Sequence, residues 1–341
     1  MAPLSNTRVI RTKYADGVAL TIDNFKTETV QFEHTLQDGE LLLRNLYLGL
    51  DPYIRFSFND FGPKNSTIGQ PVSGFGIAEV VGSKNDKFPV SSVVIASNIA
   101  WEQYTIAKDT TSYQIIPDIR NPAVPPEAYL NVLGITGLTA WAAIETHAKF
   151  KKDDTVFISS AAGPVGQSLA IQAKRRGAFV IGSAGSDEKV RFLLEDLKID
   201  AAFNYKTQDA RSELSRIAPA GLDAYLDLVG GETLDIAISK LKNHGHVIAI
   251  GNIGTVNGAQ PYVTKNLNLI IVKALQINGF TAFEHLRRFT EFWEATKPLV
   301  LSGEIQLRDS ITEGVEKAPQ TFVDYLQGKF TGKAIVKVAD L

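Results

Sequence analysis

The sequence has no cysteine and a single methionine among its 341 residues. Without cysteine the chain can form no disulfide, offer no thiolate nucleophile and hold no zinc through thiolate ligands. Histidine is also scarce, and two of the five histidines, His244 and His246, form a His-x-His pair. On a strand both would point to the same face and could share a metal, but no further histidine or carboxylate at ligand spacing completes a set. We therefore expect no metal site and interpret the two histidines as a polar pair at a strand end.

Neither a strong net charge nor a long apolar run is present. The formal net charge is −2, and lysine and arginine are spread along the chain, so nothing electrostatic predicts nucleic acid or an anionic membrane as a partner. No apolar run approaches the roughly 18 residues that a membrane-spanning helix needs. The N-terminal MAPLSNTRVIRTKYADG has no apolar core of signal-peptide length. We expect a cytoplasmic protein that binds neither nucleic acid nor a membrane.

The length of the chain, and a change from β-rich segments to alternating strands and helices, predict two domains. Hydrophobic residues form 44% of the sequence, which is enough apolar material for two cores. Residues 1–126 are β-rich, with apolar, β-branched segments at Glu40–Leu50, Gly76–Gly82 and Ser92–Ala96. The proline-rich run NPAVPPEAYL (Asn121–Leu130) then marks a domain junction.

From residue 127 to 300 the pattern alternates between strands and helices, which is typical of βαβ units and a parallel sheet. The expected strands are 155–159, 178–182, 201–204, 222–228, 246–251 and 274–279. The expected helices are 135–148, 165–176, 187–197, 209–217, 232–241 and 284–301. The remaining segment, 301–341, ends in the alternating strand KAIVKV (Lys333–Val338), which we expect to return to the first domain.

The strongest local signal lies where the expected strand 155–159 runs into AAGPVG (Ala161–Gly166) and then into a helix. This is the dinucleotide-binding fingerprint with its first glycine replaced by Ala161. Gly163 would let the backbone approach a pyrophosphate, and Gly166 would let the helix pack closely on the strand. The helix N-terminus at Val165 would present free N–H groups to the phosphates. A strand–helix turn with a purely structural role is the alternative.

The residues after the second strand of this unit bear on the choice between NAD and NADP. Asp187 stands about 20 residues past the last glycine, where an acid would bind the ribose 2′-OH of NAD. However, the small residues SAGS (183–186) intervene, and Asp187 falls where a helix N-cap is expected. The small residues leave room for a 2′-phosphate that Lys189 could meet. The pattern therefore favours NADP over NAD.

Several longer motifs together resemble one protein family. GSAGSDEKV followed by AFNYKT is similar to the prostaglandin reductase/leukotriene hydroxydehydrogenase group and the related plant 2-alkenal reductases, zinc-free members of the medium-chain dehydrogenase/reductase superfamily. Further matching stretches span nearly the whole chain in the expected order: LGLDPYIR (48–55), GQPVSGFGIAEVV (69–81), LGITGLTAW (133–141), LDLVGGETLD (226–235) and GKAIVKV (332–338).

The resemblance implies an α/β fold with a GroES-like β-rich catalytic domain, a doubly wound Rossmann domain and a C-terminal return to the first domain. It implies NADPH as cofactor, with Lys189 and Tyr205 at the 2′-phosphate and Ser186 nearby; taken alone, Tyr205 would be a half-buried aromatic after a strand. It also implies a homodimer formed by extension of the Rossmann sheets. The candidate cofactor residues from the fingerprint and the resemblance together are Thr136, Ala161, Gly163, Pro164, Val165, Gly166, Gly185, Ser186, Lys189, Asn204, Tyr205, Gly251, Asn252, Phe280 and Thr281.

Other superfamily members polarise a carbonyl with a zinc ion that cysteine helps to hold. Because this chain has no cysteine, we expect it not to use that chemistry. We expect an NADPH-dependent 2-alkenal/enone reductase, in which a hydride adds to the β-carbon of an α,β-unsaturated carbonyl substrate and a proton adds to the α-carbon. The resemblance places the active-site tyrosine at Tyr53, and Pro52 would fix the turn that aims it. Tyr53 would donate a hydrogen bond to the enolate. The ribose 2′-OH of the cofactor and water are alternative donors, and packing is the alternative role for the tyrosine.

Two positions depart from the family pattern. Val256 stands where the group commonly has a tyrosine, and Phe330 stands where it often has an asparagine between two glycines. Both changes bear on the substrate profile and the cofactor contacts. Close to Tyr53, Asp51 and Arg55 could pair to brace the turn or form an ordinary surface pair.

Four aromatic side chains near these motifs could line an apolar substrate pocket or belong to the core: Phe56, Phe58, Phe61 and Trp101. Two rival functions stay open. One is a zinc-free NADPH:quinone reductase of the same superfamily, although the motif pair AGSDEK and NYKT favours the alkenal group. The other is a non-catalytic NADPH-binding protein, which the missing loop tyrosine would permit.

Overall fold

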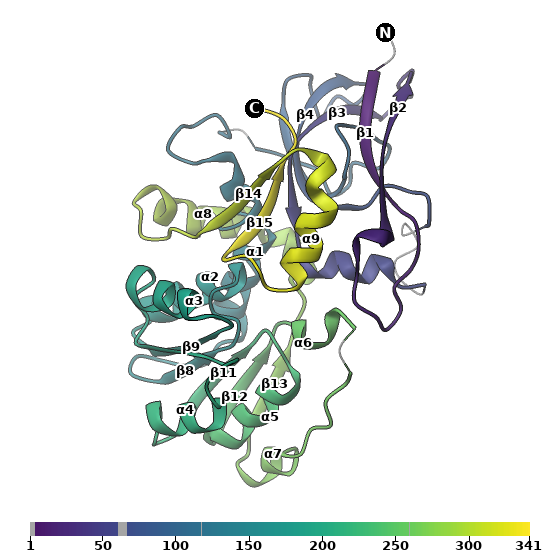
Figure 1. Ribbon diagram of the computed structural model, residues 1–341. Helices are drawn as coiled ribbons and strands as arrows, with labels where there is room; N and C mark the ends of the chain where they lie inside the picture. The colour runs from purple at the N-terminus through teal and green to yellow at the C-terminus, as the bar shows by residue number, and fades with distance from the viewer. Residues whose placement is uncertain (1–3, 61–66, 117, 259) are drawn as a thin grey trace. The chain divides into compact units, whose positions relative to one another are not determined.

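The computed structural model describes residues 4–60, 67–116, 118–258 and 260–341 (Figure 1). The chain divides into two compact units: the first comprises Met1–Asn131 and Asp309–Leu341, and the second comprises Val132–Arg308. The chain thus leaves the first unit and returns to it at its C-terminal end. The domain boundaries that the sequence places at 126 and 300 stay predictions. Among the described residues, no helix is both long enough and apolar enough to pass through a bilayer.

The first unit is built on β-strands. These are β1 (Leu4–Arg11), β2 (Phe25–Phe32), β3 (Leu41–Leu50), β4 (Ser73–Ser83), β5 (Val93–Ala100), β6 (Tyr104–Ala107), β7 (Gln114–Ile115), β14 (Asp309–Glu313) and β15 (Lys333–Lys337). Seven of them form one sheet in the order β14-β15-β3-β4-β5-β7, with β6 beside β3, and β1 pairs with β2. Strand β15 pairs antiparallel with β3, so the C-terminal segment completes the sheet of the first unit, as expected. The helical elements are η1 (Ile22–Asn24), η2 (Pro52–Phe58), η3 (Pro126–Leu130), η7 (Val315–Lys317) and α9 (Ala318–Leu326).

Aromatic side chains fill the core of the first unit. Phe58 and Trp101 have no exposed surface and pack with Phe25, whose ring lies 4.9 Å from that of Phe58 and 6.2 Å from that of Trp101. Phe56, by contrast, is 50% exposed. Phe58 and Trp101 are therefore core residues rather than the pocket lining considered above, and Phe61 lies outside the described residues.

The second unit is a doubly wound α/β domain, as the alternating pattern predicts. Its six strands are β8 (Thr155–Ile158), β9 (Phe179–Ala184), β10 (Ala201–Asn204), β11 (Leu222–Asp227), β12 (Leu241–Ala249) and β13 (Gln276–Gly279). They are all parallel, in the order β10-β9-β8-β11-β12-β13. The helical elements include α1 (Ile135–Ala142), α2 (Pro164–Arg175), α3 (Asp187–Arg191), α4 (Ala210–Ile217), α5 (Gly231–Lys240), α6 (Ile253–Val256), α7 (Asn268–Val272) and α8 (Phe289–Leu301). The strand order reverses between β8 and β11, where such sheets bind ligands.

Residues of this sheet alternate between two hydrophobic clusters, one on each face. Val156 and Ile158 of β8 pack with Leu169 of α2, whereas Phe157 between them packs with Leu214 of α4. A period of two, with apolar residues on both sides, is the pattern of a strand that helices cover on both faces. Because helices cover both faces of the sheet, the candidate site lies in the loops at the carboxyl ends of the strands.

Strand β12 differs from the expectation. It begins at Leu241 rather than at His246, and its register with β11 is irregular near its start. His244 has a left-handed φ of 62° and is exposed, whereas His246 is buried and accepts a hydrogen bond at Nε2 from the backbone N–H of Lys149 at 3.2 Å. The prediction that both histidines share one face is therefore wrong. In the part of the chain that the structure describes, no three His, Asp or Glu side chains are grouped to hold a metal ion.

Two expected helices change type along their length. The helix expected at 187–197 consists of α3 followed by a π-helical turn, Phe192–Asp196. The helix expected at 284–301 begins as the 3-10 helix η6 (Ala282–Arg288) and continues as α8. Both segments keep the predicted path between strands, so the order of the elements is unaffected.

Candidate functional site

The dinucleotide fingerprint forms the turn between β8 and α2. Ser160 has a left-handed φ of 50°, so the strained position of this turn comes one residue before Ala161, which explains why alanine is tolerated there. Gly163 is the N-cap of α2 and Pro164 is its first residue, and no side chain of the described residues caps this helix. Its first N–H groups are thus not capped by a side chain, which is the arrangement found where a helix N-terminus binds an anion. A Cβ on Gly166 would overlap the carbonyl oxygen of Ser160, so glycine is required for this close approach.

Contacts to the next strand hold this turn in place. The backbone N–H of Ala161 donates to the carbonyl of Ser183 in β9 at 2.9 Å, and the N–H of Gly163 donates to the carbonyl of Ser160 at 2.9 Å. Ala161 is fully buried, and Val165 packs at the rim of the same hydrophobic cluster. The N-terminus of α2 is thus fixed at the carboxyl edge of the sheet, next to the point where the strand order reverses.

A second group of candidate residues follows β9. Ser186 is the N-cap of α3, and its hydroxyl accepts a hydrogen bond from the backbone N–H of Lys189 at 3.3 Å. Asp187, the expected N-cap, is instead the first residue of this helix, and its carboxylate accepts a hydrogen bond from the side-chain amide of Asn204 at 2.7 Å. The N-cap prediction is therefore wrong by one residue, because the Ser186 hydroxyl reaches the helix and Asp187 is used to hold the end of β10.

Tyr205 and Lys206, which follow β10, complete this group. The backbone N–H of Tyr205 donates to the carbonyl of Ala184 at 3.1 Å. The place that a Cβ of Gly185 would occupy lies 3.1 Å from the Tyr205 hydroxyl and 3.3 Å from Cε of Lys206, so a side chain at position 185 would crowd both. Lys206 is absent from the candidates predicted from the sequence, although its place directly after Tyr205 in NYKT was the available signal.

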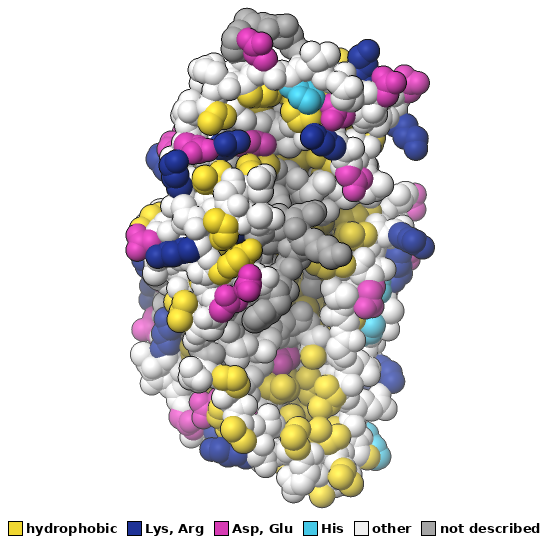
Figure 2. Space-filling model, turned by 90° about the vertical axis from the view of Figure 1, so that its right-hand side faces the viewer, with side chains coloured by type: hydrophobic (Ala, Val, Ile, Leu, Met, Phe, Trp, Pro, Cys, Tyr) yellow, Lys and Arg dark blue, Asp and Glu magenta, His cyan; other side chains and the backbone are white. Residues whose placement is uncertain are grey.

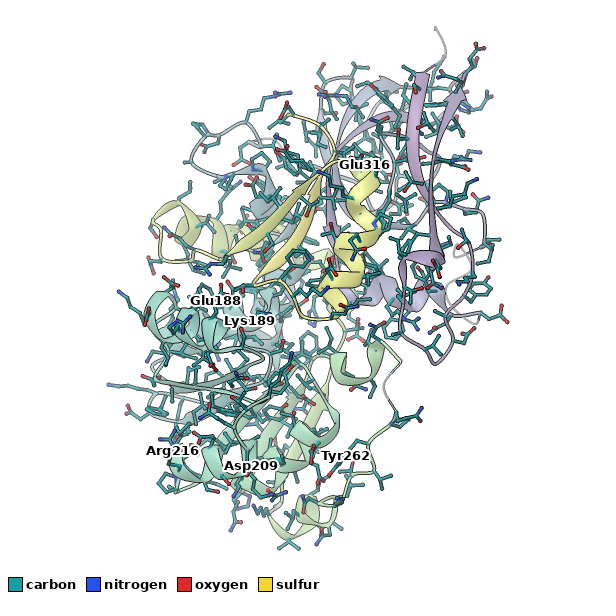
Figure 3. All side chains as sticks on the ribbon, in the orientation of Figure 1. Glu188, Lys189, Asp209, Arg216, Tyr262 and Glu316 are labelled. Carbon is teal, nitrogen blue, oxygen red and sulfur yellow. The ribbon has the colours of Figure 1, made fainter. Side chains whose placement is uncertain are left out.

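Lys189 and Lys206 bring two positive charges to this group, which we call the Lys189 cluster (Gly185, Ser186, Lys189, Tyr205 and Lys206). Burial lowers the pKa of Lys189, and the charge of Lys206 lowers it further. An anion beside the two ammonium groups would offset this unfavourable charge interaction at Lys189. Figure 3 shows Lys189 beside Glu188 on α3. The cluster therefore fits a phosphate on the adenosine ribose of a dinucleotide.

Gly251 and Asn252 lie in the turn after β12. The N–H groups of Ile250 and Gly251 donate to the carbonyl of Asp227 at 2.9 and 3.0 Å. Gly230, in the turn after β11, has a φ of 71°, and a Cβ there would overlap the side-chain oxygen of Asn252. The structure thus brings the turns after β11 and β12 together at the carboxyl edge of the sheet.

The remaining cofactor candidates take other positions in the second unit. Phe280 packs at the rim of the hydrophobic cluster that contains Ala161, and its ring stacks on His147 at 4.4 Å. The hydroxyl of Thr281 caps η6 by accepting a hydrogen bond from the backbone N–H of the residue two positions later, at 3.4 Å. Thr136, near the start of α1, is 2% exposed. Their roles at the cofactor stay predictions.

Tyr53 belongs to the first unit and lies in η2, with Asp51 as the N-cap and Pro52 as the first residue. Tyr53 is half-buried, its hydroxyl accepts a hydrogen bond from the backbone N–H of Phe75 at 3.1 Å, and the two rings meet edge to face at 6.5 Å. Burial, and then the negative charge of Asp51, hold the pKa of Tyr53 well above its usual range, against the opposing hydrogen bond from Phe75. The phenol therefore stays protonated at neutral pH and can act as a hydrogen-bond donor but not as a base.

The turn that begins η2 is braced by a different residue from the one predicted. Asp51 pairs with the ammonium group of Lys333 on β15, and Lys333 is completely buried. Arg55 instead donates to the backbone carbonyls of Ala15 and Val18. The predicted Asp51–Arg55 pair is therefore wrong, because the guanidinium is used to hold the loop that follows β1.

The two departures from the family pattern lie in different units. Val256 is half-buried at the end of α6. In the loop after it, the hydroxyl of Tyr262 donates to the carboxylate of Asp235 in α5 at 3.3 Å, so this tyrosine is held against a helix (Figure 3). Phe330 packs at the rim of the core of the first unit.

Comparison with protein families finds two matching regions. Residues 9–115 match a family described as the N-terminal domain of oxidoreductase, and residues 164–297 match a family described as zinc-binding dehydrogenase. The second description refers to zinc, whereas this chain has no cysteine to form a thiolate zinc site.

Individual relatives match almost the whole chain. The NADP(+)-dependent 2-alkenal reductase of Nicotiana tabacum is 33% identical over 346 residues, which cover 98% of this chain and 98% of the relative. Prostaglandin reductase 1 of Bos taurus is 35% identical, covering 93% of this chain and 94% of the relative. Among solved structures, CurA from Vibrio vulnificus in complex with NADPH is 26% identical with a TM-score of 0.86, covering 98% of this chain and 100% of that chain.

Proposed function

Because the chain belongs to the medium-chain dehydrogenase/reductase superfamily, and within it to the zinc-independent prostaglandin reductase and 2-alkenal reductase group, we propose that it reduces the activated C=C bond of α,β-unsaturated carbonyl compounds with NADPH. Its coarser assignment is that of an NAD(P)H-dependent oxidoreductase with a GroES-like domain and a Rossmann domain. The name of the tobacco relative, a 2-alkenal reductase, supports the finer assignment.

The choice of NADPH is carried by the Lys189 cluster. Lys206 lies close enough to Lys189 for its charge to lower the pKa of Lys189, and the missing side chain at Gly185 lets Tyr205 and Lys206 approach the end of β9. A 2′-phosphate at this place would accept hydrogen bonds from both ammonium groups and neutralise their repulsion. Asp187 accepts a hydrogen bond from Asn204 at Oδ1, so one of its carboxylate oxygens is already used within the protein, whereas an NAD-binding acid would accept from the ribose hydroxyl.

The proposed reaction needs one hydride and one proton. The hydride that adds to the β-carbon of the substrate would come from NADPH when it is bound. The electron pair of the double bond moves toward the carbonyl oxygen, and the chain must stabilise the negative charge of the resulting enolate with a hydrogen-bond donor. We assign this role to Tyr53, whose raised pKa keeps its proton in place. A proton from the solvent then adds to the α-carbon and gives the saturated carbonyl product.

The proposal is tested with a panel of enals, enones and quinones, each with NADPH and with NADH, by following the absorbance of the reduced nicotinamide. We expect turnover of enals or enones with a clear preference for NADPH, and product analysis should show a saturated carbonyl compound. Turnover of quinones alone would favour the quinone reductase alternative. Tight NADPH binding without any turnover would favour a non-catalytic role.

The homodimer stays a proposal, which a surface of the second unit supports. Strand β13 ends the sheet among the described residues, and hydrophobic side chains near it are strongly exposed: Val263 is 80%, Ile271 85% and Val272 72% exposed. Figure 2 shows hydrophobic side chains gathered at the lower end of this face, at the height where Figure 1 places α7. Exposed apolar patches of this kind mark association sites. Light scattering after size-exclusion chromatography should give the mass of a dimer, and a monomer would contradict the proposal.

A further inference from the structure

A buried chain of side-chain hydrogen bonds joins the ends of two neighbouring strands in the second unit. The hydroxyl of Tyr225 in β11 lies 2.9 Å from Oγ of Ser159, which follows β8, and 2.7 Å from Oδ1 of Asp227 at the end of β11. All three side chains are almost completely buried, with exposed fractions of 0% for Ser159 and Tyr225 and 2% for Asp227. Polar groups this deep in a sheet are costly unless every one of them is paired.

The direction of each hydrogen bond follows from counting protons. Oδ1 of Asp227 also accepts hydrogen bonds from the backbone N–H groups of Val229 at 3.0 Å and Gly230 at 2.8 Å, so it is an acceptor for Tyr225 as well. The single proton of the Tyr225 hydroxyl therefore points to Asp227, and the Ser159 hydroxyl donates to the Tyr225 oxygen. Oγ of Ser159 in turn accepts a hydrogen bond from the N–H of Leu228 at 3.0 Å. One closed set of hydrogen bonds thus fixes the backbone on both sides.

The same segment also carries the turn after β12. The carbonyl of Asp227 accepts hydrogen bonds from Ile250 and Gly251, and the carbonyl of Leu228 accepts one from Ile253 at 3.1 Å. On the other side, Ser159 directly precedes Ser160, the left-handed residue of the fingerprint turn. Tyr225 therefore links the fingerprint turn, the candidate pyrophosphate site, to the Gly251–Asn252 turn after β12.

We propose that Tyr225 is a positioning residue for the dinucleotide: its hydroxyl sets the separation between the fingerprint turn and the Gly251–Asn252 turn. This inference rests on the dinucleotide binding that the proposed function includes. A site whose two halves are held at the correct spacing before the ligand arrives loses less free energy to ordering when it binds. Tyr225 lies away from the Lys189 cluster, on the other side of β8, so its effect concerns the part of the cofactor that NADPH and NADH share.

The test uses Y225F, which removes the hydroxyl but keeps the ring that stacks on Phe157 with centroids 5.0 Å apart. Binding of NADPH and NADH is titrated by nucleotide fluorescence, without substrate. We expect the Kd of both nucleotides to rise by the same factor, about tenfold, which corresponds to about 1.4 kcal/mol. The matched control is Y129F, which removes the hydroxyl of another fully buried tyrosine that donates to an aspartate, Asp118, at 2.9 Å in the first unit; it should leave both Kd values unchanged.

Separate measurements distinguish the possible failures. Thermal unfolding of Y225F reports any loss of global stability, and a lower Tm with unchanged Kd values would mean a purely structural role and overturn the proposal. A change in the NADPH to NADH preference would also overturn it, because that preference belongs to the Lys189 cluster. If Y225F does not fold, S159A interrupts the same chain and should raise both Kd values equally. If the wild-type protein binds neither nucleotide, the proposed function itself fails.

Discussion

Lys333 and Asp51 form a buried ion pair that joins the last strand of the chain to the turn carrying Tyr53. The two residues are 282 positions apart in the sequence, and Lys333 has no exposed surface. A charge this deep is tolerated because its partner is in direct contact with it. The pair therefore ties the return of the chain to the place where the proposed hydrogen-bond donor sits.

Replacing Lys333 with methionine should destabilise the protein by about 3–5 kcal/mol, because it leaves the carboxylate of Asp51 buried without a counterion. Urea unfolding measures this change. The matched control is K337M on the same strand, where Lys337 forms an exposed pair with Asp340. That variant should be destabilised much less, because a solvent-screened pair contributes little. If both variants lost the same free energy of unfolding, the buried pair would contribute nothing specific. The double variant D51N/K333M should recover part of the stability that K333M loses, because it no longer buries an unpaired charge.

Replacing Tyr53 with phenylalanine should lower kcat for an enone by about ten- to a hundredfold, since the enolate loses a hydrogen-bond donor. The Kd for NADPH should stay within a factor of about two, because the hydroxyl acts on the substrate rather than on the cofactor. Y113F, which removes the hydroxyl of a buried tyrosine packed edge to face on Phe88, serves as the control and should keep full activity. Unchanged turnover in Y53F would transfer the donor role to the ribose hydroxyl or to water.

Replacing Lys189 or Lys206 with alanine should weaken NADPH binding by about ten- to a hundredfold, because each variant removes a charge-assisted hydrogen bond to the 2′-phosphate. NADH binding should change little, so the ratio of the two Kd values measures the effect. K174A, which removes a lysine that pairs with Asp200 at the end of α2, should leave the ratio unchanged. A parallel loss of NADPH and NADH affinity in K189A would argue against a phosphate site at this cluster.

Asp309 should make the stability of the protein depend on pH near neutrality. Burial raises the pKa of Asp309 to about 7, and Glu127 adds to the shift, against the opposing hydrogen bond from Asn131 and the charge of Lys333. Because the folded state holds this proton more tightly than the unfolded state, the contribution is present at low pH and is lost as pH rises through about 7. Urea unfolding between about pH 5 and pH 8 should show wild type losing stability relative to D309N. A constant difference between the two proteins over this range would contradict the assigned pKa.

Local patterns account for the parts of the fold that the sequence predicted. The strands and helices after residue 150 were predictable because apolar side chains that face the core recur about every two residues in a strand and every 3.6 residues in a helix. The fingerprint turn was recognisable for the same reason: Gly163 and Gly166 are demanded by contacts within a few residues of themselves, such as that of Gly166 with Ser160. Lys206 could have been found too, since it adjoins Tyr205.

The sequence by itself therefore determined the class of both domains, the place of the dinucleotide turn and the exclusion of a thiolate metal site. Tertiary structure alone decided the partners of the buried polar groups: Asp51 with Lys333, and Tyr225 with Ser159, which is 66 positions away. It also decided that His244 and His246 take different faces. The physical reason is that periodicity and steric demand act between neighbours along the chain, whereas the partner of a buried charge or hydroxyl depends on which distant strands become adjacent.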